Sequence, residues 1–279
     1  MREIEGEAVS CVYLRNMKRR SFVKASLTGT AGLLSASAYA SSAKAAKNEP
    51  EYYELRVYNF KTDVQQRLVE DYYKDAAMPA LNKLGCKHIG VFTELKPVGQ
   101  TRLFVIITYT GIQHFASVNT TLDNDAEYQQ QAAAYLNAPV SAPAYERIES
   151  SLLKAFAHMP RMNAPAATQR IFELRQYQSS SEAAGKKKIE MFNYKGEIDI
   201  FKRLGFKPVF FGETIIGNAR PNLTYMVTFE DMAAHDAHWK AFGSDPGWKK
   251  ISSVPEYADA LLVSKITATF IVPGSYSQI

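Results

Sequence analysis

Two short segments of this chain are nearly identical and lie far apart. YELRVY occupies residues 53–58 and FELRQY occupies residues 172–177. Two further pairs of blocks follow at almost the same spacing: LNKLGCK (81–87) with FKRLGFK (201–207), and LFVIITY (103–109) with LTYMVTF (223–229). Three similar blocks in one order indicate a duplicated domain, because solenoid repeats recur at roughly 20–50 residues.

The first copy contains signals for strands and helices in a definite order. Alternating polar and apolar residues predict a strand from Tyr53 to Phe60. Thr62 and Gln65 form a capping-box pattern that opens a helix, and Gly85 suits the end of that helix. Two strands, a helix and a last strand are then expected at 88–94, 102–109, 123–137 and within 148–156. The order is β-α-β-β-α-β, that of the ferredoxin-like unit.

The second copy repeats this order. Ser179 and Glu182 supply the capping pattern, and Leu204-Gly205 marks a helix end. Its later strands are expected at 206–216, 223–229 and 261–271. Between the copies, MPRMNAPAATQ is rich in Pro and Ala and predicts a linker. The predicted division is therefore a leader at 1–45, a first repeat at 46–158, a linker at 159–169 and a second repeat at 170–279.

A four-stranded antiparallel sheet with helices on one face leaves its other face uncovered. Two such sheets can bury their open faces against each other. We therefore predict an α+β protein with two tandem ferredoxin-like repeats, whose sheets pack face to face as a barrel-like sandwich within one chain.

Alternation along the repeated strand sorts its side chains onto two faces. The apolar set is Tyr53, Leu55 and Val57, which we expect under the helices. The polar set should face the space between the sheets and comprises, over both copies, Glu54, Arg56, Tyr58, Glu173, Arg175 and Tyr177.

Basic residues are concentrated at the N-terminus. Residues 1–45 hold seven of the 33 Lys and Arg residues but three of the 28 Asp and Glu residues, so the remainder is nearly neutral. Binding to nucleic acid needs a clustered basic surface, and we therefore expect no nucleic-acid partner.

The segment from Met17 to Ala40 has the pattern of an export signal. Basic residues precede a weakly apolar stretch, and small residues suited to cleavage follow. RRSFVK (19–24) resembles a twin-arginine signal, with a general secretory signal as the alternative. The stretch is shorter and more polar than the ~20 apolar residues of a membrane span. We expect Met17 to be the start, no transmembrane segment, and a periplasmic or extracellular protein.

The two ELRxY segments, together with FEDMAAHDAHWKAFGSDPGWKKI (229–251), resemble the NIPSNAP family of the dimeric α/β-barrel superfamily. The resemblance covers about residues 50–279 and implies this fold, but no settled reaction. The first copy has YTGIQHFASVN in place of the segment with Trp239 and DPGW, so the resemblance does not imply a symmetric pair of sites.

The polar set of the repeated strand is the first candidate site. Facing Arg and Glu side chains with tyrosines can bind a small polar or acidic ligand between the sheets, because Arg pairs with carboxylates in a fork. The alternative is an ion-pair network that only fixes the packing. His88, at the start of a predicted strand, is a further candidate for the space between the sheets or for a buried core position.

His235 and His238 lie three residues apart and are weak candidates for a metal site or a haem ligand, against a solvated helix surface. No nucleophile elbow, phosphate loop, dinucleotide fingerprint or HExxH motif is present in the sequence. We therefore expect a ligand-binding protein of undefined activity, without a predicted cofactor, as a monomer or a homo-oligomer. The alternative is an oxidoreductase of the dimeric α/β-barrel type, either a monooxygenase or a haem-dependent enzyme.

Overall fold

The computed structural model describes residues 49–279 of the chain. The predicted leader at 1–45, with its RRSFVK motif, lies outside the described residues. Within them, no helix is both long enough and apolar enough to cross a membrane.

The first repeat follows the predicted order. Its elements are β1 (Tyr52–Asn59), α2 (Asp63–Tyr72), the π-helical turn η1 (Tyr73–Ala77), α3 (Met78–Lys83), β2 (Gly90–Glu94), β3 (Arg102–Tyr109), α4 (Ile112–Asp123), α5 (Ala126–Gln131), α6 (Ala133–Leu136) and β4 (Arg147–Ala155). Thr62 and Gln65 form the expected capping box at the start of α2. Gly85 adopts a φ of 91°, which glycine reaches without strain, and so it turns the chain after α3.

The second repeat has the same order. Its elements are β5 (Ile171–Gln178), α7 (Glu182–Tyr194), α8 (Glu197–Arg203), β6 (Lys207–Ile216), β7 (Asn222–Phe229), α9 (Met232–Ser244), α10 (Pro246–Ser252), the 3-10 turn η2 (Pro255–Tyr257), α11 (Asp259–Leu262) and β8 (Lys265–Pro273).

Three details of the prediction are wrong. Residues 112–123, for which no helix was predicted, form α4. The N-cap of α7 is Ser181, whose hydroxyl accepts from the amide of Ala184, and not Ser179. The last strand begins at Lys265, because the residues expected to start it form α11.

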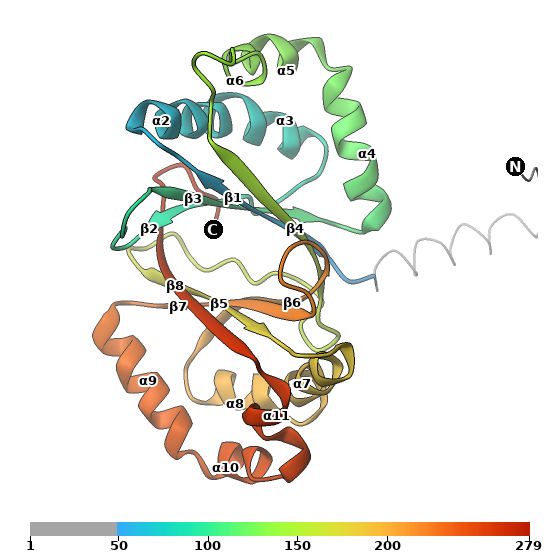
Figure 1. The fold of residues 1–279 in the computed structure, drawn as a ribbon, viewed down its shortest axis with the longest axis vertical. Coiled ribbons are helices and arrows are strands. Elements are labelled where there is room, and N and C mark those ends of the chain that lie inside the picture. The colour runs from blue at the N-terminus through green and yellow to red at the C-terminus, as the bar shows by residue number, and fades with distance from the viewer. Residues whose placement is uncertain (1–48) are drawn as a thin grey trace, which may run out of the picture. The chain divides into compact units, whose positions relative to one another are not determined.

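The eight strands form a closed antiparallel barrel in the order β1-β3-β2-β8-β5-β7-β6-β4. Figure 1 shows the helices of the first repeat on one outer side of this barrel and the helices of the second repeat on the opposite side. The prediction of two sheets that pack face to face is thus confirmed, and the strands β2, β8, β4 and β6 join the sheets at their edges.

The assignment of the strand faces was wrong. Tyr53 and Leu55 belong to the apolar core inside the barrel, with Phe172 and Leu174 from β5. Tyr58 instead belongs to the core between the first sheet and its helices. Both faces of the strand are buried. The barrel interior is filled by apolar side chains, mostly from the strands, with Met162 and Ile279 added from the linker and the C-terminus. The polar side chains lie on the other face, under helices that bring hydrogen-bonding partners.

His88 is also misplaced by the prediction. It is exposed in the turn before β2, with a φ of 55°, and does not face the barrel interior.

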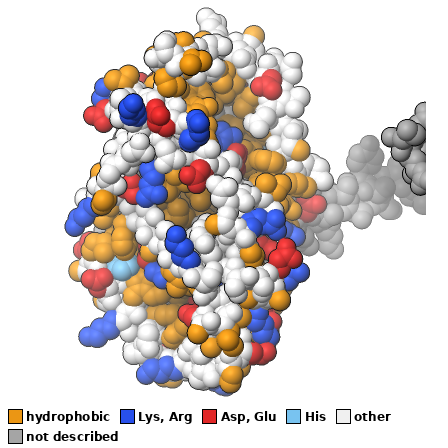
Figure 2. Space-filling model, viewed as in Figure 1, with side chains coloured by type: hydrophobic (Ala, Val, Ile, Leu, Met, Phe, Trp, Pro, Cys, Tyr) orange, Lys and Arg blue, Asp and Glu red, His pale blue; other side chains and the backbone are white. Residues whose placement is uncertain are grey.

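On the molecular face drawn in Figure 2, basic and acidic side chains are interspersed with hydrophobic ones.

Candidate functional site

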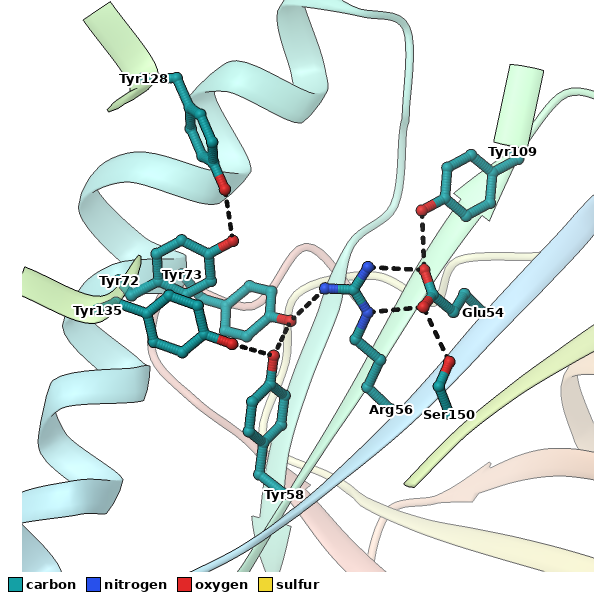
Figure 3. A network of polar contacts seen from close by, with 9 residues as sticks. All are labelled: Glu54, Arg56, Tyr58, Tyr72, Tyr73, Tyr109, Tyr128, Tyr135 and Ser150. Atoms are coloured by element: carbon teal, nitrogen blue, oxygen red, sulfur yellow. Dashed lines mark hydrogen bonds and ion pairs between the residues drawn. The ribbon is translucent and has the colours of Figure 1, made fainter. Parts of the chain in front are cut away.

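Glu54 is the centre of a buried polar network in the first repeat, drawn in Figure 3. Arg56 donates two hydrogen bonds to its carboxylate, from Nε at 2.8 Å and from Nη2 at 2.9 Å. The hydroxyls of Tyr109 and Ser150 donate two more, at 3.0 and 2.9 Å. Burial would raise the pKa of Glu54, but the charge of Arg56 and these hydrogen bonds outweigh it and hold the pKa below its ordinary value.

Tyrosines complete this network on the helix side. Arg56 Nη1 lies 3.4 Å from the hydroxyl of Tyr73, which bonds the hydroxyl of Tyr58 at 2.8 Å. Tyr58 in turn contacts Tyr135 at 3.1 Å, as Figure 3 shows. Every buried polar side-chain atom of this network that the structure describes has a hydrogen-bond partner. The first repeat therefore satisfies its own buried charges.

Glu173 holds the same position in the second repeat, with a different set of partners. It is only 1% exposed, and Arg175 Nη1 donates to it at 2.7 Å. The indole of Trp239 donates at 2.9 Å. His235 Nε2 lies 3.3 Å from the carboxylate but makes no hydrogen bond with it. Two of these partners come from α9, so this helix largely defines the cluster.

Arg175 connects Glu173 to the aromatic residues of the cluster. Its Nη2 donates to the hydroxyl of Tyr177 at 3.1 Å, and Tyr177 contacts Tyr225 at 3.3 Å. The guanidinium lies 4.5 Å from the centre of the Trp239 ring, a cation–π arrangement. The Nε–H of Arg175 is buried and has no partner among the described residues.

A second buried ion pair lies beside Tyr177. Lys188 is 1% exposed, and its Nζ lies 5.6 Å from the Tyr177 ring centre, 3.0 Å from Asp259 and 3.7 Å from Glu197. Burial raises the pKa of Glu197 to about 7 despite the opposing charge of Lys188. The Oε2 atom of Glu197 has no hydrogen bond.

Unsatisfied polar atoms therefore concentrate in the second repeat. Four buried side-chain atoms lack a hydrogen-bond partner among the described residues: Arg175 Nε, His235 Nε2, Glu197 Oε2 and the Tyr276 hydroxyl. The first three belong to one cluster under the helices of the second repeat. A buried polar group without a partner costs about 1–3 kcal/mol, so such a concentration needs an explanation.

The predicted site residues separate into two groups. The Glu–Arg pairs form within each repeat, between residues two apart on one strand, and not across the two sheets as expected. The expected site between the sheets is thus wrong, because apolar side chains occupy that space. His88 lies outside both clusters.

The two histidines of α9 do not act together. His235 faces Glu173, whereas His238 Nδ1 donates to the backbone oxygen of Ala234. Among residues 49–279, no three His, Cys, Asp or Glu side chains gather as metal ligands.

Sequence reasoning missed Lys188 and Glu197. One signal was available. Lys188 is the seventh residue of α7, and the seventh residue of α2 is the fully buried Val69, so the duplicated pattern placed a lysine at a core position.

A cavity of about 330 Å³ borders the second cluster. It is lined by Glu94, Leu95, Lys96, Arg102, Met232, Ala268, Thr269 and Phe270. Ala268 pairs with Arg175 across the strands, and Phe270 pairs with Glu173. The Phe270 ring centre is 4.9 Å from that of His235. Larger cavities, of about 500 and 520 Å³, lie along residues 156–163, and one of about 370 Å³ lies at Gly196, Ile200 and Tyr257; none of the three is lined by Glu54, Glu173 or Arg175.

Comparisons with known proteins agree with this fold. The NIPSNAP family model matches residues 172–278, which supports this family for the second repeat. No curated protein sequence matches the chain.

Solved structures extend the likeness to the whole barrel. A candidate monooxygenase from Lactobacillus acidophilus NCFM matches 81% of this chain and 94% of its own, with a TM-score of 0.56 and 10% identity. A candidate monooxygenase from Fusobacterium nucleatum matches 81% and 93%, with a TM-score of 0.55 and 11% identity. A NIPSNAP-like domain protein from Burkholderia xenovorans matches 39% and 89%, with a TM-score of 0.35 and 18% identity. At these identities, the likeness to the two monooxygenase structures shows the fold alone, that of the dimeric α/β barrel.

Proposed function

We propose that this protein is an exported NIPSNAP-like protein that binds a small organic molecule under the helices of its second repeat. The observation that carries the proposal is the contrast between two matched clusters. The cluster around Glu54 is fully hydrogen-bonded, whereas the cluster around Glu173 keeps three buried polar atoms without a hydrogen bond, two of them in longer ion-pair contacts. A ligand that hydrogen-bonds those atoms recovers the free energy that the folded protein forgoes.

Arginine-to-lysine variants in the two repeats test this proposal. Lysine keeps the charge but loses the forked donors of arginine. With Trp248→Phe as background, Trp239 is the only tryptophan left of the two in the chain, so its fluorescence reports on the cluster. We expect small hydroxylated organic acids to change this fluorescence and to raise the melting temperature.

The matched variants separate binding from folding. Arg175→Lys should weaken binding at least about tenfold, whereas Arg56→Lys should bind like the parent protein. Equal losses in both variants, or no response of the parent protein to any such acid, would contradict the proposal.

An oxidoreductase is the second candidate. The two fold neighbours described as candidate monooxygenases favour it, as does the position of His235. Its Nδ1 bonds the exposed Asp236 at 2.8 Å while Nε2 faces the buried Glu173, so the imidazole can pass a proton between solvent and a bound substrate. Oxygen consumption with a bound hydroxylated acid would favour this reading over binding alone.

Haem belongs to this alternative. His235 is the imidazole of the cluster that would hold the iron, and iron would have to displace its 3.3 Å contact with Glu173. If haem binds there, haemin added to the purified protein should give a Soret band whose maximum is shifted from that of free haemin. His235→Phe should abolish that shift.

Export is proposed from the sequence alone. If the twin-arginine route carries the chain, replacing both Arg19 and Arg20 by lysine should leave unprocessed precursor in the cytoplasm. Normal processing of that double variant would exclude this route.

A further inference from the structure

The cavity beside the second cluster is built by both repeats. Leu95, Lys96 and Arg102 come from the β2–β3 hairpin of the first repeat, and Met232 and Phe270 come from the second. The amide of Leu95 donates to the carbonyl oxygen of Phe270 at 2.9 Å, which ties the hairpin to β8. Leu95 also packs against the helix-side core of the second repeat. In Figure 1 the hairpin and α9 lie on the same side of the barrel.

The cavity and the cluster are adjacent at three points. Ala268 lies opposite Arg175, and Phe270 lies opposite Glu173 on the neighbouring strand. Met232 lies three residues before His235, and therefore on the same face of α9. Arg175 and His235 do not themselves line the cavity, so a ligand in it would reach their unsatisfied atoms between Ala268, Phe270 and Met232, the lining residues next to them.

Two of these atoms indicate the chemistry of the inner end of a ligand. Arg175 Nε is a donor without an acceptor. His235 Nδ1 bonds Asp236 at 2.8 Å, and its Nε2 lies 3.3 Å from the carboxylate of Glu173 without a hydrogen bond. A hydroxyl group has two acceptor lone pairs and one donor, so it can accept from Arg175 Nε and pair with Nε2 whether that atom donates or accepts. Neither a carboxylate nor an ammonium group does this.

The hairpin indicates the chemistry of the outer end. Lys96 is exposed at the rim, and Arg102 lies beside it, paired with Glu94. Between the two ends, Met232 and Phe270 provide an apolar wall. Since the ion pair of Arg102 leaves Lys96 as the unpaired positive charge of the rim, an anionic group fits there.

We infer that the site takes a hydroxylated organic carboxylate with an apolar, aryl-sized body, and that the β2–β3 hairpin of the first repeat recognises its carboxylate. This inference rests on the proposed function and names its ligand class. The hydroxyl bonds Arg175 and His235, the body lies on Met232 and Phe270, and the carboxylate pairs with Lys96. The first repeat thereby completes a site whose buried end belongs to the second.

Three probes of similar size test the two ends separately. They are 4-hydroxyphenylacetate, its neutral analogue 2-(4-hydroxyphenyl)ethanol, and phenylacetate, which lacks the hydroxyl. Dissociation constants are measured by calorimetry on the full chain. Lys96→Ala should weaken 4-hydroxyphenylacetate and phenylacetate about fivefold and leave the neutral alcohol unchanged. Lys83→Ala, at an exposed lysine of α3 that pairs with Glu127 in the helix layer of the first repeat, is the control and should change nothing.

The inner end is tested by His235→Phe. His235 is the fourth residue of α9, and the fourth residue of α4 is Phe115, so this variant introduces the residue that the first repeat has at the matching position. It should weaken the two hydroxylated probes and leave phenylacetate unchanged. If the native protein binds the neutral alcohol as tightly as the acid, or if Lys96→Ala affects both equally, the role of the hairpin is wrong while binding in the second repeat stands. If none of the three probes binds, both proposals fail.

Discussion

The two repeats place the same ELRxY strand under their helices, but they complete it differently. In the first repeat, hydroxyls from neighbouring strands, Tyr109 and Ser150, donate to Glu54. The strand register puts Phe229 and Ala268 at the matching positions of the second repeat, and neither can donate. The lost donors are replaced from α9, where Trp239 and His235 stand at the positions that α4 fills with Asn119 and Phe115.

This difference shows how a duplicated domain can divide its tasks. The carboxylate of Glu54 receives all its hydrogen bonds from its own sheet, so it is satisfied as soon as the strands pair. A network that depends on a helix keeps polar atoms that other groups can reach, at a cost in stability. We interpret the first cluster as part of the frame of the barrel and the second as the part available for binding.

Removing the arginine from each cluster should give the largest contrast. Arg56→Ala leaves Glu54 buried without its charge partner and should cost about 3–5 kcal/mol of unfolding free energy. Arg175→Ala should cost less, about 1–3 kcal/mol, because Glu173 keeps Trp239 and the nearby His235. Urea unfolding of both variants measures the two values.

The order of these two costs is the critical result. A larger cost for Arg175→Ala would mean that the second cluster, and not the first, supports the fold. Equal costs would remove the distinction between the two repeats.

The pH dependence of stability should show a smaller contrast. Glu197, which faces Lys188, Asp259 and Arg175, has its pKa raised by burial from 4.5 to about 7. The folded state therefore binds its proton more tightly than the unfolded state does. Its contribution is fully present below pH 4.5 and is lost as pH rises through 7, up to about 3 kcal/mol at ~1.4 kcal/mol per pKa unit.

Glu54 behaves in the opposite way. Its lowered pKa gives a contribution that is present above pH 4.5 and is lost as pH falls further. Unfolding free energies at pH 5 and pH 8 should therefore differ less in Glu197→Gln than in the parent protein. In Glu54→Gln, the decrease of the unfolding free energy from pH 5 to pH 8 should be as large as in the parent protein. A parent-like difference in Glu197→Gln would show that this carboxyl does not titrate in that range.

Much of the fold was predictable because it depends on local patterns. The capping box at Thr62, the glycine turn at Gly85 and the strand Arg102–Tyr109 are each specified by residues close in sequence, and the structure contains all three. The helix α4 was missed because its first turn has no side-chain cap. The sequence identified three candidates, Glu173, Arg175 and His235, but it did not predict that they lie in one cluster.

The sequence by itself determined the duplication, the order of the elements and, through the open face of each sheet, the closed barrel. Alternation along YELRVY also determined that Glu54 and Arg56 share a face, because period-2 geometry is local. It could not determine which face lies inside, since both faces of a barrel strand are buried. Only the tertiary structure decided this, by bringing the indole of Trp239 to Glu173 from 66 residues away. The polar side chains of the repeated strand lie where such distant donors can reach them, whereas apolar side chains fill the barrel interior.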